Sequence, residues 1–493
     1  MKCLLFNVVY ERIETHSLPQ RSLGVYKIAH LLRSQNWDVE VIDYATLWNI
    51  DQLKELAKSR ITSDTKFIGF SKLFDLWPPL METFAGWLKE TYPWLVLISG
   101  SQYHKGYSSK YIEYYISGYA EAALTHLLKY LFSNGPAPMF SLASNSQRKI
   151  IDANTFYPST SGDDLFVDYE DRDFINPNEW LAIEFSRGCK FECGFCDFPF
   201  LNVKGDPSRS QADFEKQIKD AYNRFGVQKY TVSDSTFNDR TEKITKFADV
   251  VDRLDFDIHF SGYIRADLII SRPRDREELS RMKFCGHFYG IESFNAQTTK
   301  CIGKGMHPDK IKQGLLDVKN YFQTTGTKRY NAQISLIAGL PYETPESLRA
   351  GLQWVEDNWI PQPYTLSPYL ILLNTDKSSI ISREYAEYGY ESMEHELDPE
   401  IAAKVKNALR DSGDALVWKN PHMNIIEAYQ IHKEFDERNV IKCHPSAFGL
   451  SNIMFNRLTL EQTMNLTNEA PLVNEIVEQD LFINTYINNK LSI

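Results

Sequence analysis

The chain has 493 residues, of which 43% are apolar, and it carries a formal net charge of −11 with an isoelectric point of about 5.6. This length and apolar content suffice to bury more than one hydrophobic core, so we expect a globular protein of about three domains. The acidic balance argues against a general binder of nucleic acids or membrane surfaces, because such proteins carry basic patches and a high isoelectric point.

The N-terminal stretch MKCLLFNVVY contains an apolar run that is too short to span a membrane, and no small-residue cleavage site follows it. We therefore expect a strand in a cytoplasmic protein with no membrane span. The seven cysteines are an odd number, and three of them are bunched together. Because this pattern is not a disulfide framework, it favours a reducing compartment and a metal or redox role for the bunched thiols.

Residues 1–135 alternate between short apolar runs and amphipathic, helix-length segments. The predicted strands are KCLLFNVVY, DVEVIDY, KFIGFS and WLVLISG, and the predicted helices include LGVYKIAHLLRS and AEAALTHLLKYLF. This alternation predicts an open, parallel α/β sheet.

Three further regions follow. Residues 136–179 are rich in Ser, Pro, Gly and Asn, which predicts a linker. Residues 180–390 contain six strand candidates separated by helical text, namely WLAIEFS, KYTVSDS, FDIHFSGYI, HFYGIES, QISLIAGLP and YTLSPYLILL. That pattern predicts a barrel-like or sheet-like α/β domain. In residues 391–493 no strands are expected, and three segments predict a smaller helical unit: PEIAAKVKNALR, NIIEAYQIHKEFDER and LVNEIVEQDLFINTYINNK.

The bunched cysteines, Cys189, Cys193 and Cys196, have the spacing C-x3-C-x2-C and directly follow the strand WLAIEFS. They therefore lie at the carboxyl end of the first strand of the second α/β unit, the edge at which such folds build active sites. A structural zinc site needs four ligands, and this sequence offers no second pair of cysteines and no nearby histidine. Three thiolates favour a 4Fe-4S cluster with one open iron, with zinc or plain buried thiols as the alternatives.

These residues resemble the signature C-x3-C-x-aromatic-C of the radical S-adenosylmethionine (radical SAM) enzymes, with Phe195 as the aromatic residue. Further motifs resemble, in order and spacing, those of the subclass that often has a cobalamin-binding-type domain in front. They are SDSTFND, GYIRADL, YGIES, KGMHPDKI and LIAGLPYETPES. The resemblance covers most of residues 180–375. It implies an N-terminal Rossmann-like domain, a partial (β/α)6 barrel with the cluster at its carboxyl end, and a small, mainly helical C-terminal domain.

The resemblance also implies the chemistry. In the family, the open iron binds the amino and carboxylate groups of SAM, and reductive cleavage gives methionine and a 5′-deoxyadenosyl radical that abstracts a substrate hydrogen. By this resemblance Cys189, Cys193 and Cys196 are the cluster ligands. The implied SAM contacts are Phe195 and Ile337 near the adenine, Ser233, Asp234 and Ser235 facing the methionine amino group, Arg265 pairing with the carboxylate, and Glu292 and Ser293 at the ribose or methionine end.

Plainer roles remain open for three of these residues. Asp234 has the residue type expected to cap the following helix. Arg265 and Asp267 are close enough in sequence to form an ordinary ion pair. Glu292 has few structural reasons to lie at a barrel mouth, although a structural role stays an alternative.

The cobalamin prediction rests on partial motifs. Ser71 and Leu73, followed by Gly100 and Ser101, partly resemble the steps that admit the cobalamin tail, with Ser101 in place of a glycine. The ligand loop Asp-x-His-x-x-Gly is absent, so no lower-axial histidine is assigned. Cobalamin is thus a possible third cofactor beside the 4Fe-4S cluster and SAM, and a docking or substrate-recognition domain is the alternative.

The sequence therefore predicts a radical SAM enzyme acting on C–H bonds, with cobalamin-dependent methyl transfer as the favoured reaction. Cobalamin-independent epimerisation, rearrangement, cyclisation or oxidation is the alternative, and a non-catalytic Fe-S scaffold or electron carrier is the alternative from another class. The family implies a reductant such as flavodoxin or ferredoxin. The substrate is a small molecule, a lipid or a peptide, whereas nucleic acid is disfavoured.

Overall fold

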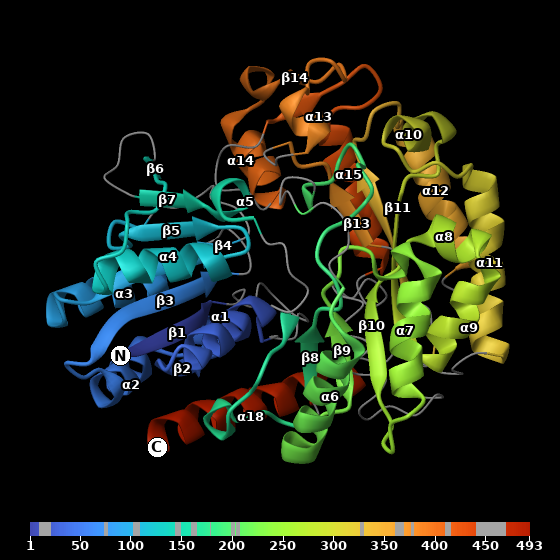
Figure 1. The fold of residues 1–493 in the computed structure, drawn as a ribbon. Coiled ribbons are helices and arrows are strands. Elements are labelled where there is room, and N and C mark those ends of the chain that lie inside the picture. The colour runs from blue at the N-terminus through green and yellow to red at the C-terminus, as the bar shows by residue number, and fades with distance from the viewer. Residues whose placement is uncertain are drawn as a thin grey trace.

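The computed structural model describes residues 1–8, 21–72, 77–101, 109–142, 149–158, 165–177, 179–198, 203, 208–325, 330–359, 369–375, 379–409, 416–439 and 470–493. Leu73 lies outside these residues. Two sheets dominate the described part, one built from the N-terminal third of the chain and one from its centre (Figure 1).

The first sheet has the order β2-β1-β3-β4-β5-β7-β6 among the described strands, and its pairs are parallel except for the edge pair β6 and β7. Its strands are β1 (Lys2–Val8), β2 (Asp38–Ile42), β3 (Thr65–Lys72), β4 (Val96–Ser101), β5 (Tyr114–Ser117), β6 (Ser141–Leu142) and β7 (Lys149–Asp152). The helices of this region are α1 (Leu23–Ser34), α2 (Ile50–Arg60), α3 (Pro79–Thr91), α4 (Glu121–Phe132) and α5 (Ala153–Phe156). β1 is buried almost throughout, as expected for a parallel strand covered on both faces. The predicted parallel α/β sheet is confirmed.

The segment predicted as a linker contributes to this sheet. β7 pairs in parallel with β5, and β6 pairs antiparallel with β7. Residues 136–179 do have the composition of a loop, but they include the strand KIID. With four residues, this strand is too short to give a recognisable periodic pattern.

The second sheet is parallel throughout, in the order β13-β12-β11-β10-β9-β8, and it curls into a half-barrel (Figure 1). Its strands are β8 (Trp180–Ile183), β9 (Lys229–Val232), β10 (His259–Tyr263), β11 (Phe284–Glu292), β12 (Asn331–Ala338) and β13 (Tyr369–Leu372). The helices between them are α6 (Gln211–Phe225), α7 (Thr241–Val251), α8 (Ala266–Ser271), α9 (Pro273–Arg281), α10 (Ala296–Cys301), α11 (Pro308–Thr324) and α12 (Pro345–Asn358). All six strand predictions in this region are confirmed.

Side-chain alternation gives the half-barrel two different faces. Phe185, Phe214 and Phe247 have ring centroids 4.5–5.3 Å apart, and they fill the layer between the sheet and helices α6 and α7. Thr231 and Ser261, which are neighbours in the register of β9 and β10, lie on the opposite, concave face. The aromatic core therefore holds the helices, while small and polar residues line the concave side.

The C-terminal region departs from the prediction in two ways: it contains short strands, and its last helix packs on a helix of the N-terminal region. Short strands β14 (Glu391–Ser392) and β15 (Trp418–Lys419) pair with each other, although no strands were expected after residue 390. The helices are α13 (Ile380–Arg383), α14 (Pro399–Ala408), α15 (Ile425–Asn439) and α18 (Ala470–Ser492). α15 contacts β13 and α12, whereas α18 packs on α2 of the first sheet's layer.

Buried polar contacts fix α18 at that position. The backbone N–H of Asp43 donates to the Tyr486 hydroxyl at 2.8 Å, and Lys490 donates to the carbonyl of Val41 at 2.8 Å. The last helix therefore belongs, by its contacts, to the N-terminal α/β layer. Within the described residues, the helices all fall short of the length and apolarity that crossing a membrane requires.

Candidate active site

The cysteine loop, residues 188–197, leaves the carboxyl end of β8. Gly188 has a φ of +89°, a conformation that glycine adopts without strain, and it turns the chain into the loop. The backbone N–H of Cys196 donates to the carbonyl of Cys193 at 2.9 Å, which closes a tight turn between these two cysteines. Cys189, Cys193 and Cys196 are all free thiols and are buried or half-buried.

The three thiols also influence one another. The pKa of Cys196 is raised to about 12, mainly by burial, and the neighbouring Cys193 and Cys189 contribute to this rise. A buried thiol such as Cys196 ionises more readily beside a cation, and a metal centre supplies one.

The three thiols of the cysteine loop are the candidate donors of a metal centre. Among the described residues, no group of three His, Cys, Asp or Glu side chains is close enough to hold one metal ion. A 4Fe-4S cluster binds each thiolate through a different iron, so its cysteines stand farther apart than the ligands of one ion. The three thiols of the loop are compatible with the predicted cluster, and the role of Cys189, Cys193 and Cys196 as its ligands stays a prediction.

Arg265, at the end of β10, lies against this loop. One guanidinium nitrogen is 3.4 Å from the Cys193 sulfur, and Nε donates to Asp267 at 2.8 Å. The guanidinium also covers the ring of Phe191, 3.7 Å from its centroid. The Arg265–Asp267 ion pair, which was the alternative role for Arg265, is thus present, and the guanidinium lies beside Cys193.

The residues after β9 divide into two groups. Ser233 is exposed and Ser235 half-exposed, so both are open to a ligand. Asp234 is buried, and its two oxygens accept hydrogen bonds from the Phe185 backbone at 2.7 Å and the Ser186 hydroxyl at 2.6 Å. These two contacts tie the carboxylate to the end of β8, and its expected contact with the methionine amino group stays a prediction.

The helix-capping alternative for Asp234 fails, because the residue that precedes α7 is Arg240. Asp234 instead joins the ends of β8 and β9. Lys243 completes this buried group, with Nζ 3.5 Å from the Asp234 carboxylate and 2.9 Å from the Ser186 hydroxyl.

Glu292 ends β11 with a φ of +70°, an unusual conformation for a residue other than glycine. Its carboxylate lies 3.2 Å from Nζ of Lys304, which also donates to the carbonyl of Gly290 at 2.7 Å. The Lys304 ammonium lies 5.4 Å from the centroid of Phe195, the aromatic residue of the signature. Burial raises the pKa of Glu292, and Lys304 opposes that rise.

Ser293 follows Glu292 and donates its hydroxyl to the buried carboxylate of Glu343, which also accepts from Ser347. Burial raises the pKa of Glu343, and the two hydroxyls oppose the rise. Ser293 is thus tied to the turn after β12. Ile337 is buried in β12 and shares the concave face with Ser335, two residues before it.

Two residues of this arrangement were not predicted. Lys304 and Glu343 lie inside the motifs KGMHPDKI and LIAGLPYETPES, but the sequence assigned no role to either. A signal for Lys304 was present, since a lysine flanked by Gly303 and Gly305 stands in a loop rather than on a helix surface. No pattern pointed to Glu343.

The expected cobalamin residues gather at the carboxyl edge of the first sheet. Ser71 of β3 is opposite Gly100 of β4 in the register, and Ser101 follows. A Cβ built on Gly100 would find its nearest neighbour, the carbonyl oxygen of Ile116, at 3.9 Å. Among the described residues, small side chains therefore line the ends of β3 and β4, which is compatible with a bound ligand at this edge.

A buried ion cluster connects this sheet with the cysteine loop. Arg187 pairs with Glu121 in the first turn of α4, and its Nε lies 3.3 Å from Glu184. Glu184 also pairs with Lys27 of α1. Burial would raise the pKa of Glu121, but Arg187 and Lys27 outweigh it and the pKa is lowered. Because α4 begins at the carboxyl edge of the first sheet, the cysteine loop lies against that edge.

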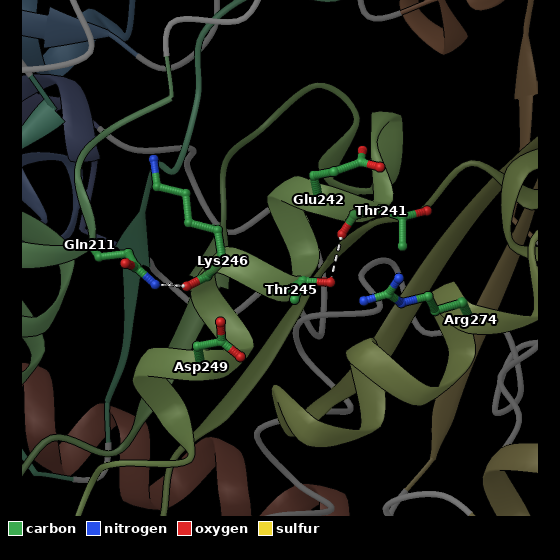
Figure 2. Close-up of a pocket in the computed structure, with 7 residues that line it drawn as sticks. All are labelled: Gln211, Thr241, Glu242, Thr245, Lys246, Asp249 and Arg274. Atoms are coloured by element: carbon green, nitrogen blue, oxygen red, sulfur yellow. Dashed lines mark hydrogen bonds between the residues drawn. The ribbon is translucent and has the colours of Figure 1, made fainter.

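A separate depression of about 340 Å³ lies on the helix layer of the half-barrel (Figure 2). Its lining residues come from α6, α7 and α9 and are polar or charged: Gln211, Thr241, Glu242, Thr245, Lys246, Asp249 and Arg274. Gln211 donates to the Lys246 carbonyl and Thr245 to the Thr241 carbonyl, as Figure 2 shows. The depression lies among the helices that cover the half-barrel sheet, whereas the cysteine loop lies at the carboxyl ends of the strands. The two sites are therefore separate.

Comparison with known families and proteins agrees with this geometry. Residues 183–355 match the family model of the radical SAM superfamily. A curated relative, the hopanoid C-2 methylase of Rhodopseudomonas palustris (strain TIE-1), is 24% identical over 185 residues, which are 36% of this chain and 34% of that protein. The match thus spans about a third of that relative's length.

Two solved structures share the fold. The radical SAM methyltransferase TsrM from Kitasatospora setae, with tryptophan and a SAM analogue bound, has a TM-score of 0.61 at 14% identity, covering 80% of this chain and 78% of TsrM. The cobalamin-dependent radical enzyme OxsB, with aqua-cobalamin and SAM bound, has a TM-score of 0.54 at 17% identity, covering 78% of this chain and 56% of OxsB. The radical SAM family uses a 4Fe-4S cluster and SAM, and both of these neighbours have structures with cobalamin bound.

Proposed function

We propose that the protein, of which residues 183–355 match the radical SAM family model, is an enzyme that reductively cleaves SAM at a 4Fe-4S cluster held by Cys189, Cys193 and Cys196. The observation that carries the proposal is the cysteine loop itself. It presents three free thiols at the carboxyl end of β8, with the Arg265 guanidinium on Cys193. An all-thiol loop with an adjacent cation suits a negatively charged cluster.

The side chains around the loop have distinct proposed roles. Arg265 lies within reach of both the cluster and a bound carboxylate, and a guanidinium has enough donors to serve Asp267 and a further anion. Glu292 and Ser293 end the central strand β11, where they would hydrogen-bond the ribose or the methionine end of SAM. The hydroxyls of Ser233 and Ser235 would accept hydrogen bonds from the methionine amino group of SAM, since these two side chains are more exposed than that of Asp234.

The bound cluster and SAM would together supply a 5′-deoxyadenosyl radical for C–H functionalisation. The protein's part is to orient and enclose them. Phe195 and Ile337 offer apolar surface for the adenine, with Ile337 on the concave face of β12. That face also carries small and polar residues, and we place the substrate there, in front of the strand ends.

We favour cobalamin-dependent methyl transfer as the overall reaction. Two findings support it: the small residues Ser71, Gly100 and Ser101 at the carboxyl edge of the first sheet, and the contact of the cysteine loop with that edge through Arg187 and Glu121. A methyl carrier bound at the first sheet would face the cluster. The alternative is a cobalamin-independent radical reaction, for which the first sheet is a docking layer.

The substrate is proposed only as a small molecule, lipid or peptide, and the electron donor as a flavodoxin or ferredoxin. The test of the function is anaerobic reconstitution with iron and sulfide, followed by SAM, dithionite and hydroxocobalamin. Bound-corrinoid absorbance after desalting and 5′-deoxyadenosine are recorded together. Deoxyadenosine with retained corrinoid supports methyl transfer, and deoxyadenosine alone supports the cobalamin-independent reaction. If neither deoxyadenosine nor retained corrinoid is detected, the result contradicts the proposal.

A further inference from the structure

Lys304 is the side chain that connects the end of β11 with the cysteine loop. Its ammonium donates to the Gly290 carbonyl at 2.7 Å, lies 3.2 Å from the Glu292 carboxylate, and lies 5.4 Å from the ring of Phe195. The Lys304 side chain is 16% exposed and that of Glu292 8% exposed. One cation thus contacts the end of the central strand and the signature aromatic residue of the cysteine loop.

The backbone around Lys304 is shaped to present it there. Gly303 and Gly305 have φ values of +78° and +75°, which residues with a side chain rarely adopt. A Cβ built on Gly303 would lie 4.0 Å from Cα of Cys193, so this loop runs directly along the cysteine loop. The N–H of Gly194 donates to the carbonyl of Ile302 at 3.1 Å and fixes the two loops together.

Glu292 depends on this contact. Its positive φ is strained for a side chain with a Cβ, and its carboxylate is buried. A Cβ built on Gly290 would lie 2.4 Å from Oε1 of Glu292. The carboxylate can therefore occupy this position only because residue 290 has no side chain. Lys304 forms the ion pair with this carboxylate, and Arg265 also opposes the rise in its pKa that burial causes. Without Lys304, burial would favour either protonation of the carboxyl group or its movement away from the strand end.

We infer that Lys304 is a positioning residue for SAM, which acts by holding the Glu292 carboxylate at a fixed place relative to the cysteine loop. This inference rests on the proposed function, since it takes Glu292 as a SAM contact. It assigns Lys304 no direct part in the cleavage of SAM. The effect of Lys304 should therefore pass through Glu292 and disappear when Glu292 cannot ionise.

The test is a double-mutant cycle on the reconstituted protein with Lys304→Met, Glu292→Gln and the double variant. Met keeps the length of the lysine side chain and removes its charge. Truncating one partner of a buried, hydrogen-bonded charge pair should weaken SAM binding at least about tenfold. The double variant should bind SAM no more weakly than the weaker single variant, because the two residues act as a unit. Lys300→Met, on the exposed surface of α10, is the matched control and should bind SAM like the wild type.

Iron and sulfide content separate a positioning role from a structural one. Each variant should retain the wild-type content, and the SAM-dependent change in the EPR spectrum of the reduced cluster should weaken in Lys304→Met and be partly restored in Lys304→Arg. If Lys304→Met loses the cluster, the SAM affinity of Glu292→Gln tests the ion pair instead, because this variant removes the charge of the other partner.

Wild-type SAM affinity in Lys304→Met, or additive losses in the double variant, would overturn the inference. An unchanged SAM affinity in Glu292→Gln would do the same. The proposed function fails in a different way: the wild-type chain would take up iron and sulfide, yet SAM would leave its EPR spectrum unchanged.

Discussion

Arg187, the residue before the turn into the cysteine loop, forms a buried ion pair with Glu121 at the start of α4. Its guanidinium lies 4.2 Å from the ring centroid of Tyr119. Glu184 pairs with both Arg187 and Lys27, and the buried Arg209 donates to the carbonyl of Glu184. The position of the cysteine loop is thereby linked to the first sheet, where the proposed cobalamin site lies.

Removing one carboxylate from this cluster should be costly. Glu121→Ala removes one of the two carboxylates that pair with the buried Arg187, and we expect the free energy of unfolding of the apo protein to fall by about 2–4 kcal/mol. Urea unfolding measures this. Glu55→Ala, at an exposed position of α2, is the control and should change stability by less than about 0.5 kcal/mol. Equal unfolding curves for Glu121→Ala and the control would show that the cluster does not stabilise the junction.

Arg265 should tune the electronic properties of the cluster. Its guanidinium donates to Cys193, and a positive charge there stabilises the reduced cluster, which carries more negative charge. We expect Arg265→Met to keep its iron content but to have a more negative reduction potential, as measured by EPR-monitored redox titration. Arg265→Lys, which retains the charge, should lie between the wild type and the Met variant. A potential unchanged in both variants would argue against this placement of Arg265.

Two glycine substitutions should separate the two proposed cofactor sites. In Gly290→Ala the new methyl group would displace the flexible end of Glu292, so SAM affinity should fall while the fold is retained. In Gly100→Ala the methyl group has space within the protein, so SAM binding should be unchanged, but a methyl group at this edge should reduce corrinoid retention. The two variants are each other's control in SAM-binding and corrinoid-retention assays. Loss of SAM affinity in Gly100→Ala, with none in Gly290→Ala, would contradict both assignments.

The fold was largely predictable because its strands are buried, apolar and of ordinary length. The six strands of the half-barrel could be read as apolar runs ending in polar or glycine-containing motifs, and their order agrees with the parallel sheet. What could not be read were pairings with little local pattern. β7 is four residues long, and the docking of α18 on α2 depends on contacts between residues more than 400 positions apart, such as Asp43 and Tyr486.

Site residues were predictable where residue type and spacing alone indicate a chemical role. They were less predictable where the role depends on contacts with residues distant in sequence. The cysteine spacing alone placed Cys189, Cys193 and Cys196 on one loop. Asp234 has the right type and position for a ligand contact, yet its oxygens accept hydrogen bonds from Phe185 and Ser186. Such competition arises from tertiary contacts, which no spacing rule in the sequence contains.

His287 gives a pH-dependent prediction away from the site. It is fully buried, hydrogen-bonds to Tyr289 at 2.7 Å, and burial lowers its pKa to about 3. Because the unfolded chain binds a proton near pH 6.5 and the folded chain does not, acidification favours unfolding between these two pKa values. We expect this one residue to account for about 2 kcal/mol of the stability lost between pH 7.5 and pH 5.

His287→Phe should therefore lose less stability than the wild type over that pH range, whatever its stability at pH 7.5. Urea unfolding of the apo proteins at both pH values measures the difference. His395→Gln, at an exposed position, should have the pH dependence of the wild type. An identical pH dependence for His287→Phe and the wild type would indicate that His287 is protonated in the folded protein.

The central claim is that the cysteine loop holds a cluster that cleaves SAM, and the most direct measurement is 5′-deoxyadenosine formation by reconstituted Cys193→Ala beside Cys301→Ala. Cys301 is a half-buried free cysteine at the end of α10 and is not one of the proposed ligands. We predict that Cys193→Ala loses both the 4Fe-4S absorbance and deoxyadenosine formation, while Cys301→Ala retains them. Deoxyadenosine formation by Cys193→Ala at the wild-type rate would contradict the account.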